Sequence, residues 1–183
     1  MLSENEVNMF FSMLQIKNNN IHMGVTRYMI TEITLLTDLQ QEIEAVVGSD
    51  GAAALFYHAS TEAAKDSTEE AGVDLMFKGM PFKEQLGFLL KITQFHGWGV
   101  GEIKEFSENP FRCVLVNKQT YIGDVYEGKA DGPRCYYTSG LLDIFEFFAK
   151  MNEIDLKLQM TETKCKAKGD SYCEWIIEPE API

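Results

Sequence analysis

The spacing of apolar residues changes along the chain, and this change limits the possible folds most strongly. Up to Phe95, apolar residues recur mainly every three or four positions, which is the period of a helix with one buried face. After Gly97-Trp98-Gly99 the period becomes mainly two, which is typical of a strand. Helices followed mainly by strands predict the α+β class, with a helical layer packed on an antiparallel sheet.

Three helices are expected in the first half of the chain. One covers 34–47, where a glycine follows, and an alanine-rich one covers about 51–66. A third begins near Pro81 and continues to Phe95. Before them, weak alternation on both sides of Asn18-Asn19-Asn20 predicts a short hairpin or a strand that leads into a helix.

The second half is expected to contain three strands and one helix. The segments 111–116, 154–160 and 173–177 alternate between apolar and polar residues, and 135–151 shows a helical apolar face. Gly169-Asp170 supplies residues typical of the hairpin turn between the last two strands.

Charge and hydropathy exclude two classes of partner. The chain has 28 acidic and 16 basic residues, a formal net charge of −12, which repels nucleic-acid phosphates and anionic membrane surfaces. No apolar run approaches the roughly 18 residues that a membrane span needs, so we expect neither nucleic-acid binding nor a membrane span. The acidic start MLSENEVNMF lacks the basic region of a secretory signal, which predicts a cytoplasmic protein.

Cysteines and one glutamate form the candidate chemical site. Cys165 and Cys173 flank the predicted turn, so an antiparallel hairpin brings them near direct register. Glu162 continues the apolar face of the preceding strand, where a carboxylate is costly unless it is paired or binds a metal. Together with Cys135, which opens the preceding helix, these residues could bind one divalent ion.

The same residues also fit simpler interpretations. Cys165 and Cys173 could be buried thiols or a disulfide, and Glu162 could be a solvated residue at the end of a strand. A reducing compartment favours thiols or metal ligands over a disulfide. Two cysteines eight positions apart are not a C-x-x-C pair, so spacing alone leaves these alternatives open.

Two segments resemble the C-terminal signature of the 4-vinyl reductase domain family. They are CYYTSG at 135–140 and ETKCKAKGDSYC at 162–173. The segments FHGWG at 95–99 and TYIGDV at 120–125 resemble the same family more loosely. The resemblance covers about 10–178, so we expect one ligand-binding domain over 1–183.

This resemblance implies an α+β ligand-binding fold shared with the aromatic-sensing domains of bacterial activators and, more distantly, with vesicle-tethering subunits and haem-based gas sensors. In the aromatic sensors, a cysteine before the helix, the glutamate of E-x-x-C and two cysteines around a G-D turn hold zinc. The matching residues here are Cys135, Glu162, Cys165 and Cys173. Four protein ligands leave no open position, so the implied zinc ion is structural.

The resemblance also implies an apolar pocket between the helical layer and the sheet. The residues nominated to line it are Trp98, Tyr121, Leu141, Phe145, Phe148 and Met160. An aromatic stripe at helical spacing also fits plain core packing. Thr93 and Tyr121 occupy the positions of the histidine and tryptophan that bind the hydroxyl in phenol sensors, which favours a larger or fully apolar ligand over phenol.

The sequence therefore predicts a protein that is not an enzyme and binds a small hydrophobic molecule, such as an aromatic, hydrocarbon, lipid or tetrapyrrole. His22, His58 and His96 are scattered and form no catalytic pattern. We expect a sensor or carrier that forms a homodimer and, having no output domain, passes any signal to a partner in trans. Two alternatives are an enzyme or accessory protein acting on vinyl tetrapyrroles, and a scaffold subunit of a hetero-oligomer.

Overall fold

The fold is organised around a four-stranded sheet, which we call the main sheet. The computed structural model describes residues 1–24, 26–69, 77–126, 128–155 and 157–181. The sheet has the order β4-β5-β7-β6, and every neighbouring pair is antiparallel. Its strands are β4 (Gly99–Glu108), β5 (Phe111–Thr120), β6 (Leu158–Lys164) and β7 (Cys173–Pro179).

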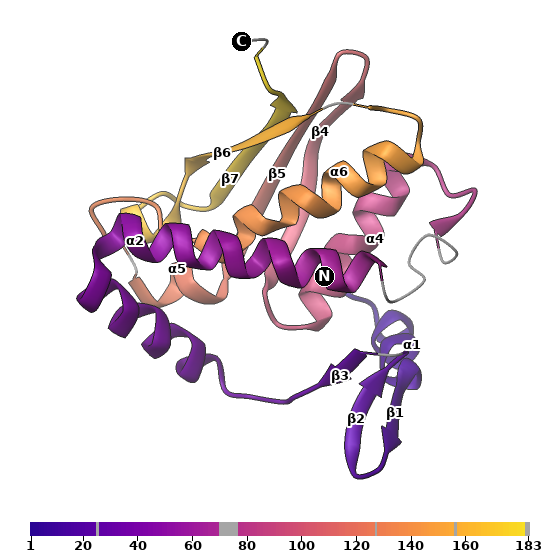
Figure 1. The fold of residues 1–183 in the computed structure, drawn as a ribbon, viewed down its shortest axis with the longest axis horizontal. Helices are drawn as coiled ribbons and strands as arrows, with labels where there is room; N and C mark the ends of the chain where they lie inside the picture. The colour runs from indigo at the N-terminus through magenta and orange to yellow at the C-terminus, as the bar shows by residue number, and fades with distance from the viewer. Residues whose placement is uncertain (25, 70–76, 127, 156, 182–183) are drawn as a thin grey trace.

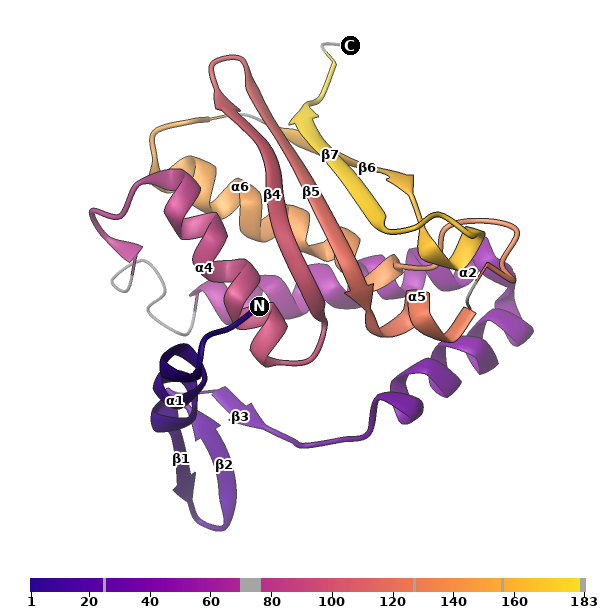
Figure 2. The ribbon, with the colours of Figure 1, turned by 180° about the vertical axis from the view of Figure 1, so that it is seen from behind.

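Two helices bury their apolar faces against this sheet. They are α4 (Phe82–Phe95), with Pro81 at its N-cap, and α6 (Leu141–Met151). The long helix α2 lies beside α6 on the same side (Figure 1), and from behind the strands stand in front of the helices (Figure 2). The predicted α+β arrangement, a helical layer on an antiparallel sheet, is confirmed.

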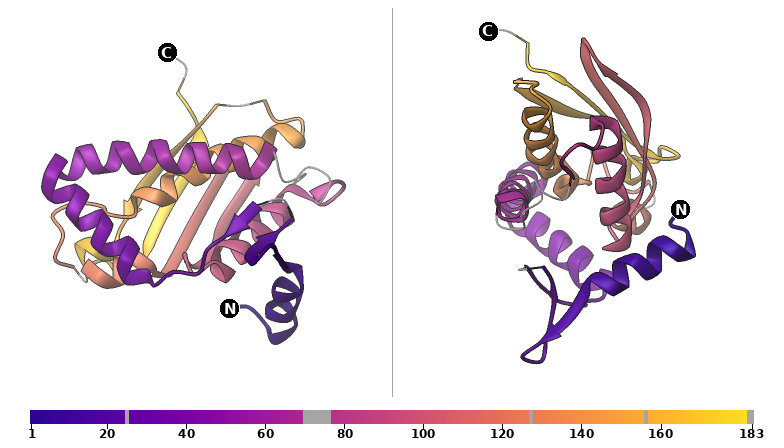
Figure 3. Two further views of the ribbon diagram at one scale, coloured as in Figure 1. Left: turned by 60° about the horizontal axis from the view of Figure 1, so that its bottom comes forward. Right: turned by 90° about the vertical axis from the view of Figure 1, so that its right-hand side faces the viewer.

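Helix α2 (Ile33–Glu69) replaces the two separate helices predicted for 34–47 and 51–66. Gly48 interrupts it with φ 76° and ψ 169°, a backbone conformation that favours glycine. The helix bends there into two arms (Figure 3), which we call the first arm (33–47) and the second arm (49–69). The predicted stop at Gly48 is thus a kink between two consecutive helical stretches.

The N-terminal residues form a small unit of their own. Helix α1 (Glu4–Met13) precedes a three-stranded antiparallel sheet made of β1 (Leu14–Lys17), β2 (Asn20–Met23) and β3 (Thr26–Tyr28). The predicted hairpin is present, and Asn18 and Asn19 form its turn with φ of 51° and 63°. Helix α1 was not predicted.

Three short helices complete the chain: α5 (Tyr121–Tyr126), η1 (Tyr136–Gly140) and η2 (Lys166–Lys168). The helix predicted over 135–151 therefore begins as a 3-10 turn, and the strand predicted from 154 begins at Leu158. Within the described ranges, none of the helices combines the length and hydropathy needed to cross a bilayer.

Candidate metal cluster and ligand cavity

The fold brings the four predicted metal ligands together. Cys135 precedes η1, Glu162 lies on β6, Cys165 follows β6, and Cys173 begins β7. One ligand atom from each residue can be chosen so that all four lie within 4.8 Å of one another. We call these four residues the cysteine cluster. It could hold a metal ion.

Distances between the sulfur atoms suit a shared ion. Cys135 Sγ lies 3.4 Å from Cys173 Sγ and 3.9 Å from Cys165 Sγ. Tetrahedral metal–thiolate bonds of about 2.3 Å place two sulfurs about 3.8 Å apart. All four cysteines of the chain are free, so the alternative of a disulfide between Cys165 and Cys173 is absent.

Glu162 supplies the strongest sign that the cluster needs a cation. Its Oε1 atom is buried and has no hydrogen-bond partner among the described residues. Burial raises the pKa of this carboxyl to about 9, because the charged form loses its hydration. A metal ion would supply both the missing partner and the compensating charge, so the donor set fits a metal.

The turn between β6 and β7 fixes the direction of the thiols. The Asp170 carboxylate accepts a 2.8 Å hydrogen bond from the Cys165 backbone N–H. The Lys166 backbone N–H donates to Cys173 Sγ at 3.3 Å. The Thr120 hydroxyl lies 3.8 Å from Cys173 Sγ and 3.9 Å from Cys135 Sγ. These contacts orient the ligands as the partners of metal-binding residues usually do.

The basic residue nearest Cys135 in sequence is paired elsewhere. Arg134 lies 3.2 Å from a Glu44 carboxylate oxygen and 2.6 Å from an Asp131 oxygen, and its side chain is only 10% exposed. The Gln40 amide also donates to the Arg134 carbonyl at 2.9 Å. This buried network attaches the first arm of α2 to the residues that lead into the cluster.

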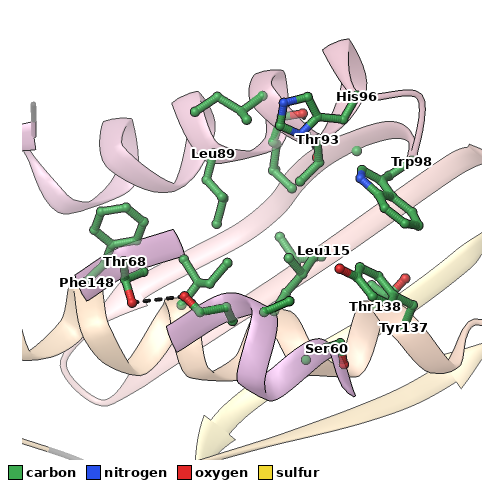
Figure 4. Close-up of a pocket in the computed structure, with 18 of the residues that line it drawn as sticks. Ser60, Thr68, Leu89, Thr93, His96, Trp98, Leu115, Tyr137, Thr138 and Phe148 are labelled. Carbon is green, nitrogen blue, oxygen red and sulfur yellow. Dashed lines mark hydrogen bonds between the residues drawn. The ribbon is translucent and has the colours of Figure 1, made fainter. Parts of the chain in front are cut away.

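A second site is a cavity of about 310 Å³ within the helical layer and against the main sheet. Its walls come from α2, α4, α6, η1 and the sheet, and the N-terminal unit contributes as well. Figure 4 shows part of the lining. The residues that line the cavity include Phe10, Met23, Tyr28, Ser60, Ala64, Thr68, Leu89, Thr93, His96, Trp98, Leu115, Tyr137, Leu141 and Phe148.

Three of the six residues nominated from the sequence line this cavity: Trp98, Leu141 and Phe148. The other three lie outside its lining. Phe145 is fully buried in the core, and Tyr121 packs edge-on behind Trp98 with ring centres 5.2 Å apart. Met160 lies on the edge strand β6 and packs against the hydrophobic core, outside the cavity lining.

The cavity is polar only at a few points. Its described lining contains no Asp, Glu, Lys or Arg. The hydroxyls of Ser60, Thr68 and Thr93 donate to carbonyl groups of their own helices. His96 also lines the cavity, and its Nε2 atom is buried with no partner among the residues described. Burial lowers the pKa of this imidazole, which favours the neutral form.

Sequence reasoning missed His96 and the N-terminal contribution to the cavity. The three histidines looked scattered because the chain carries no pattern around them. The Thr93–His96 spacing of three on a predicted helix was the available signal, since residues three apart share a helix face. Nothing in the sequence indicates that Phe10, Met23 and Tyr28 reach the same cavity.

Similarity to known proteins is found in the fold and not in the sequence. No model of a known protein family matches the chain, and no curated protein matches it. The phenol-responsive sensory domain of the transcription activator PoxR, solved with phenol, superimposes with a TM-score of 0.79 at 15% identity. The match covers 97% of this chain and 92% of that one.

A second similar structure is a trafficking protein particle complex subunit 3 from Naegleria fowleri, covalently bound to palmitic acid. It gives a TM-score of 0.54 at 12% identity and covers 81% of this chain and 95% of that one. At these identities the likeness concerns the fold alone. The chain thus shares the fold of the PoxR sensory domain.

Proposed function

We propose that this protein binds a small, uncharged, apolar molecule and acts as a sensor or carrier. The observation that carries the proposal is the cavity of about 310 Å³, whose described lining is mainly apolar and without charge. An ionised group would lose its hydration there without gaining a partner of opposite charge. The phenol-bound sensory domain of the same fold supports the proposal.

Size and chemistry favour an aromatic molecule or short hydrocarbon. Ligand pockets usually measure about 300–1,000 Å³, and this cavity lies at the lower end, which disfavours a tetrapyrrole. Covalent attachment through a thioester is also disfavoured. None of the four cysteines lines the cavity, and Cys113, the one outside the cluster, is fully buried in the core. We therefore propose that the ligand is held without a covalent bond.

We further propose that the cysteine cluster holds a structural zinc ion. Three sulfur ligands and one carboxylate oxygen are a donor set that zinc accepts, and four protein ligands close the coordination sphere. The resemblance of these residues to the 4-vinyl reductase domain family supports the same choice. Zinc would then stabilise the junction of η1, β6 and β7.

The proposal excludes catalysis in the cavity. Its described lining supplies one imidazole but no carboxylate and no thiol, and the hydroxyls of Ser60, Thr68 and Thr93 donate to helix carbonyls rather than to a base. A closed metal site has no position for a substrate or an activated water. We therefore propose binding rather than turnover, which disfavours the vinyl-reductase alternative.

We propose that a second copy of the chain covers the first arm of α2. Apolar side chains there and just before it are exposed: Met29, Ile30, Ile33, Leu35, Leu39, Val46 and Val47. Met29, Ile30 and Val46 are each more than 75% exposed. Several exposed apolar side chains on one segment are a common feature of protein–protein interfaces. A homodimer would remove it from water.

The test of ligand binding is to fill the cavity. Ala64 lines it and is 5% exposed, so Ala64→Phe should occupy ligand space. Ala59, exposed on the same arm of α2, gives the matched control Ala59→Phe. With naphthalene as the probe in calorimetry, we expect Ala64→Phe to bind at least about tenfold more weakly than the wild type, because filled volume excludes the probe.

Ala59→Phe should bind naphthalene like the wild type. A second filling variant, Leu141→Trp, approaches the cavity from α6 and guards against a local folding defect at Ala64. Equal affinity in the wild type and in both folded filling variants would contradict binding in this cavity.

A further inference from the structure

The first arm of α2 is attached to the rest of the molecule largely through polar side chains. A helix on the surface of a globular protein ordinarily docks through an apolar stripe. Within 33–47, a stretch that the structure describes completely, the two buried residues are Thr37 and Gln40, and both are polar. Leu36 and Ile43 are half-buried. The other large apolar residues of the arm are exposed: Ile33, Leu35, Leu39, Val46 and Val47.

Gln40 connects this arm to the segment that carries Cys135. Its side-chain amide donates to the Arg134 carbonyl at 2.9 Å and to a Glu44 carboxylate oxygen at 3.0 Å. The Arg134 carbonyl and the Cys135 backbone nitrogen belong to one planar peptide unit. A hydrogen bond to that carbonyl therefore restricts where the Cys135 Cα atom, and with it the thiol, can lie.

Glu44 holds the same segment through the Arg134 side chain. Its carboxylate lies 3.2 Å from Arg134 Nε and accepts a 2.8 Å hydrogen bond from the hydroxyl of Tyr126, at the end of α5. The Arg134 and Glu44 side chains are only 10% and 13% exposed. Because separating such a pair leaves a buried charge without compensation, the contact resists opening. Glu44 thus joins the first arm, α5 and the segment before Cys135.

Cys135 is the cluster residue whose position depends most on these contacts. The other three cluster residues lie on β6, in the turn after it and on β7, whereas Cys135 comes from a separate segment ahead of η1. Groups that orient a metal ligand commonly contribute about 10-fold to 100-fold to metal affinity. The contacts that fix the Cys135 segment therefore contribute to metal binding.

We infer that Gln40 and Glu44 are positioning residues of the metal site, so that zinc binding and docking of the first arm are linked. This inference rests on the proposed zinc site and extends it to a helix that supplies no ligand. The linkage is reciprocal: a docked arm favours the bound position of Cys135, and a bound ion holds the arm by the same free energy. The bend at Gly48 separates this arm from the second arm, which lines the cavity.

The zinc affinity of Glu44→Gln in the full chain tests the positioning role. This variant removes the charge and keeps the size of the side chain, and Arg134 retains a second carboxylate in Asp131, 2.6 Å away. Competition with a chelator of known affinity measures the dissociation constant. We expect zinc binding to weaken by about 10-fold to 100-fold. Glu42→Gln, at an exposed position of the same arm, should match the wild type.

Gln40→Met is a second variant that leaves the Glu44–Arg134 ion pair intact. It removes the donor to the Arg134 carbonyl, and it also removes Gln40 Oε1, a buried atom that has no partner among the described residues. The stability of the metal-free chain in urea should therefore change little. Zinc binding should still weaken by about 10-fold. A purely structural role for Gln40 would instead change the stability and leave the zinc affinity unaltered.

Hydrogen exchange of the wild type, with zinc and after chelation, tests the reciprocal effect. Chelation should speed exchange of the backbone amides of 33–47 by about 10-fold more than exchange in α4. Helix α4 serves as the internal reference because it supplies neither a ligand nor a member of the Gln40–Glu44–Arg134 network.

The outcomes separate this inference from the proposed zinc site. Wild-type zinc affinity in either folded variant, or an equal increase of exchange in 33–47 and α4, overturns the linkage and leaves the proposed zinc site in place. A wild-type chain that takes up no zinc overturns the proposed site, and the linkage with it.

Discussion

The cysteine cluster and the ligand cavity are assembled in different ways. Three of the four cluster residues lie between Glu162 and Cys173, on one hairpin whose turn is fixed by local hydrogen bonds. The cavity instead draws its lining from Phe10 to Trp175, on helices and strands from the whole chain. A site built by one turn can therefore be anticipated from spacing, whereas a site built by the packing of distant segments cannot.

The largest expected effect is on the cluster. Cys173→Ala removes a ligand from a closed metal site, and metal binding in such sites contributes directly to folding. We expect the free energy of unfolding in urea to fall by about 3 kcal/mol or more, with loss of bound zinc. Chelation of the wild type should lower the melting temperature in the same way.

Cys113→Ala is the matched control, because Cys113 is equally buried but lies in the core outside the cluster. Its cost should be close to the roughly 1 kcal/mol typical of a single substitution, with zinc retained. If both variants lost the same stability, or if neither lost metal, the cluster would be ordinary core packing.

A smaller effect is expected at the kink that joins the two regions. The first arm of α2 reaches Arg134 beside the cluster, and the second arm lines the cavity. Gly48→Ala meets no atom within 4 Å but places a side chain at φ 76°. We expect a loss of about 1–3 kcal/mol in the free energy of unfolding, from backbone strain alone. Zinc content should not change.

Gly87→Ala on α4 provides the control for that variant. It also meets no atom within 4 Å but has an ordinary helical backbone, so alanine should stabilise the protein by about 0.5–1 kcal/mol. Effects of the same sign in both variants would show that the kink at Gly48 is not held by its backbone conformation. Urea denaturation of the two variants side by side measures this difference.

Much of the framework followed from local pattern. The alternation from Leu158 to Glu162 places the glutamate on the same face as Leu158 and Met160, and the structure keeps that register against β7. The pairing of Cys165 and Cys173 followed from the turn residues between them. Cys135 was included as a third thiolate because it opens the predicted helix, and the resemblance supported this choice. Spacing alone could not establish it, because its closeness to the hairpin depends on where α6 and η1 pack.

Helix α1 and the lining of the cavity were not fully predicted, for two different reasons. Helix α1 begins with a capping box, in which Ser3 and Glu6 each accept from the other's backbone, and this S-x-x-E signal was present but unused. Phe145 and Phe148 both lie on the buried face of α6, yet only Phe148 reaches the cavity. The two residues share one helix face, and only the segments packed opposite them decide which one lines the cavity. The spacing of apolar residues in the sequence carries no information on those segments.

Native mass spectrometry of the freshly purified chain, followed by denaturation and extraction of the same sample, tests the metal site, the ligand cavity and the dimer together. It reports bound metal, bound small molecule and the number of subunits in one experiment. We expect one zinc ion per chain, a dimer, and an extractable uncharged apolar compound. A metal-free chain that also fails to take up zinc and naphthalene when both are added would contradict the proposed function.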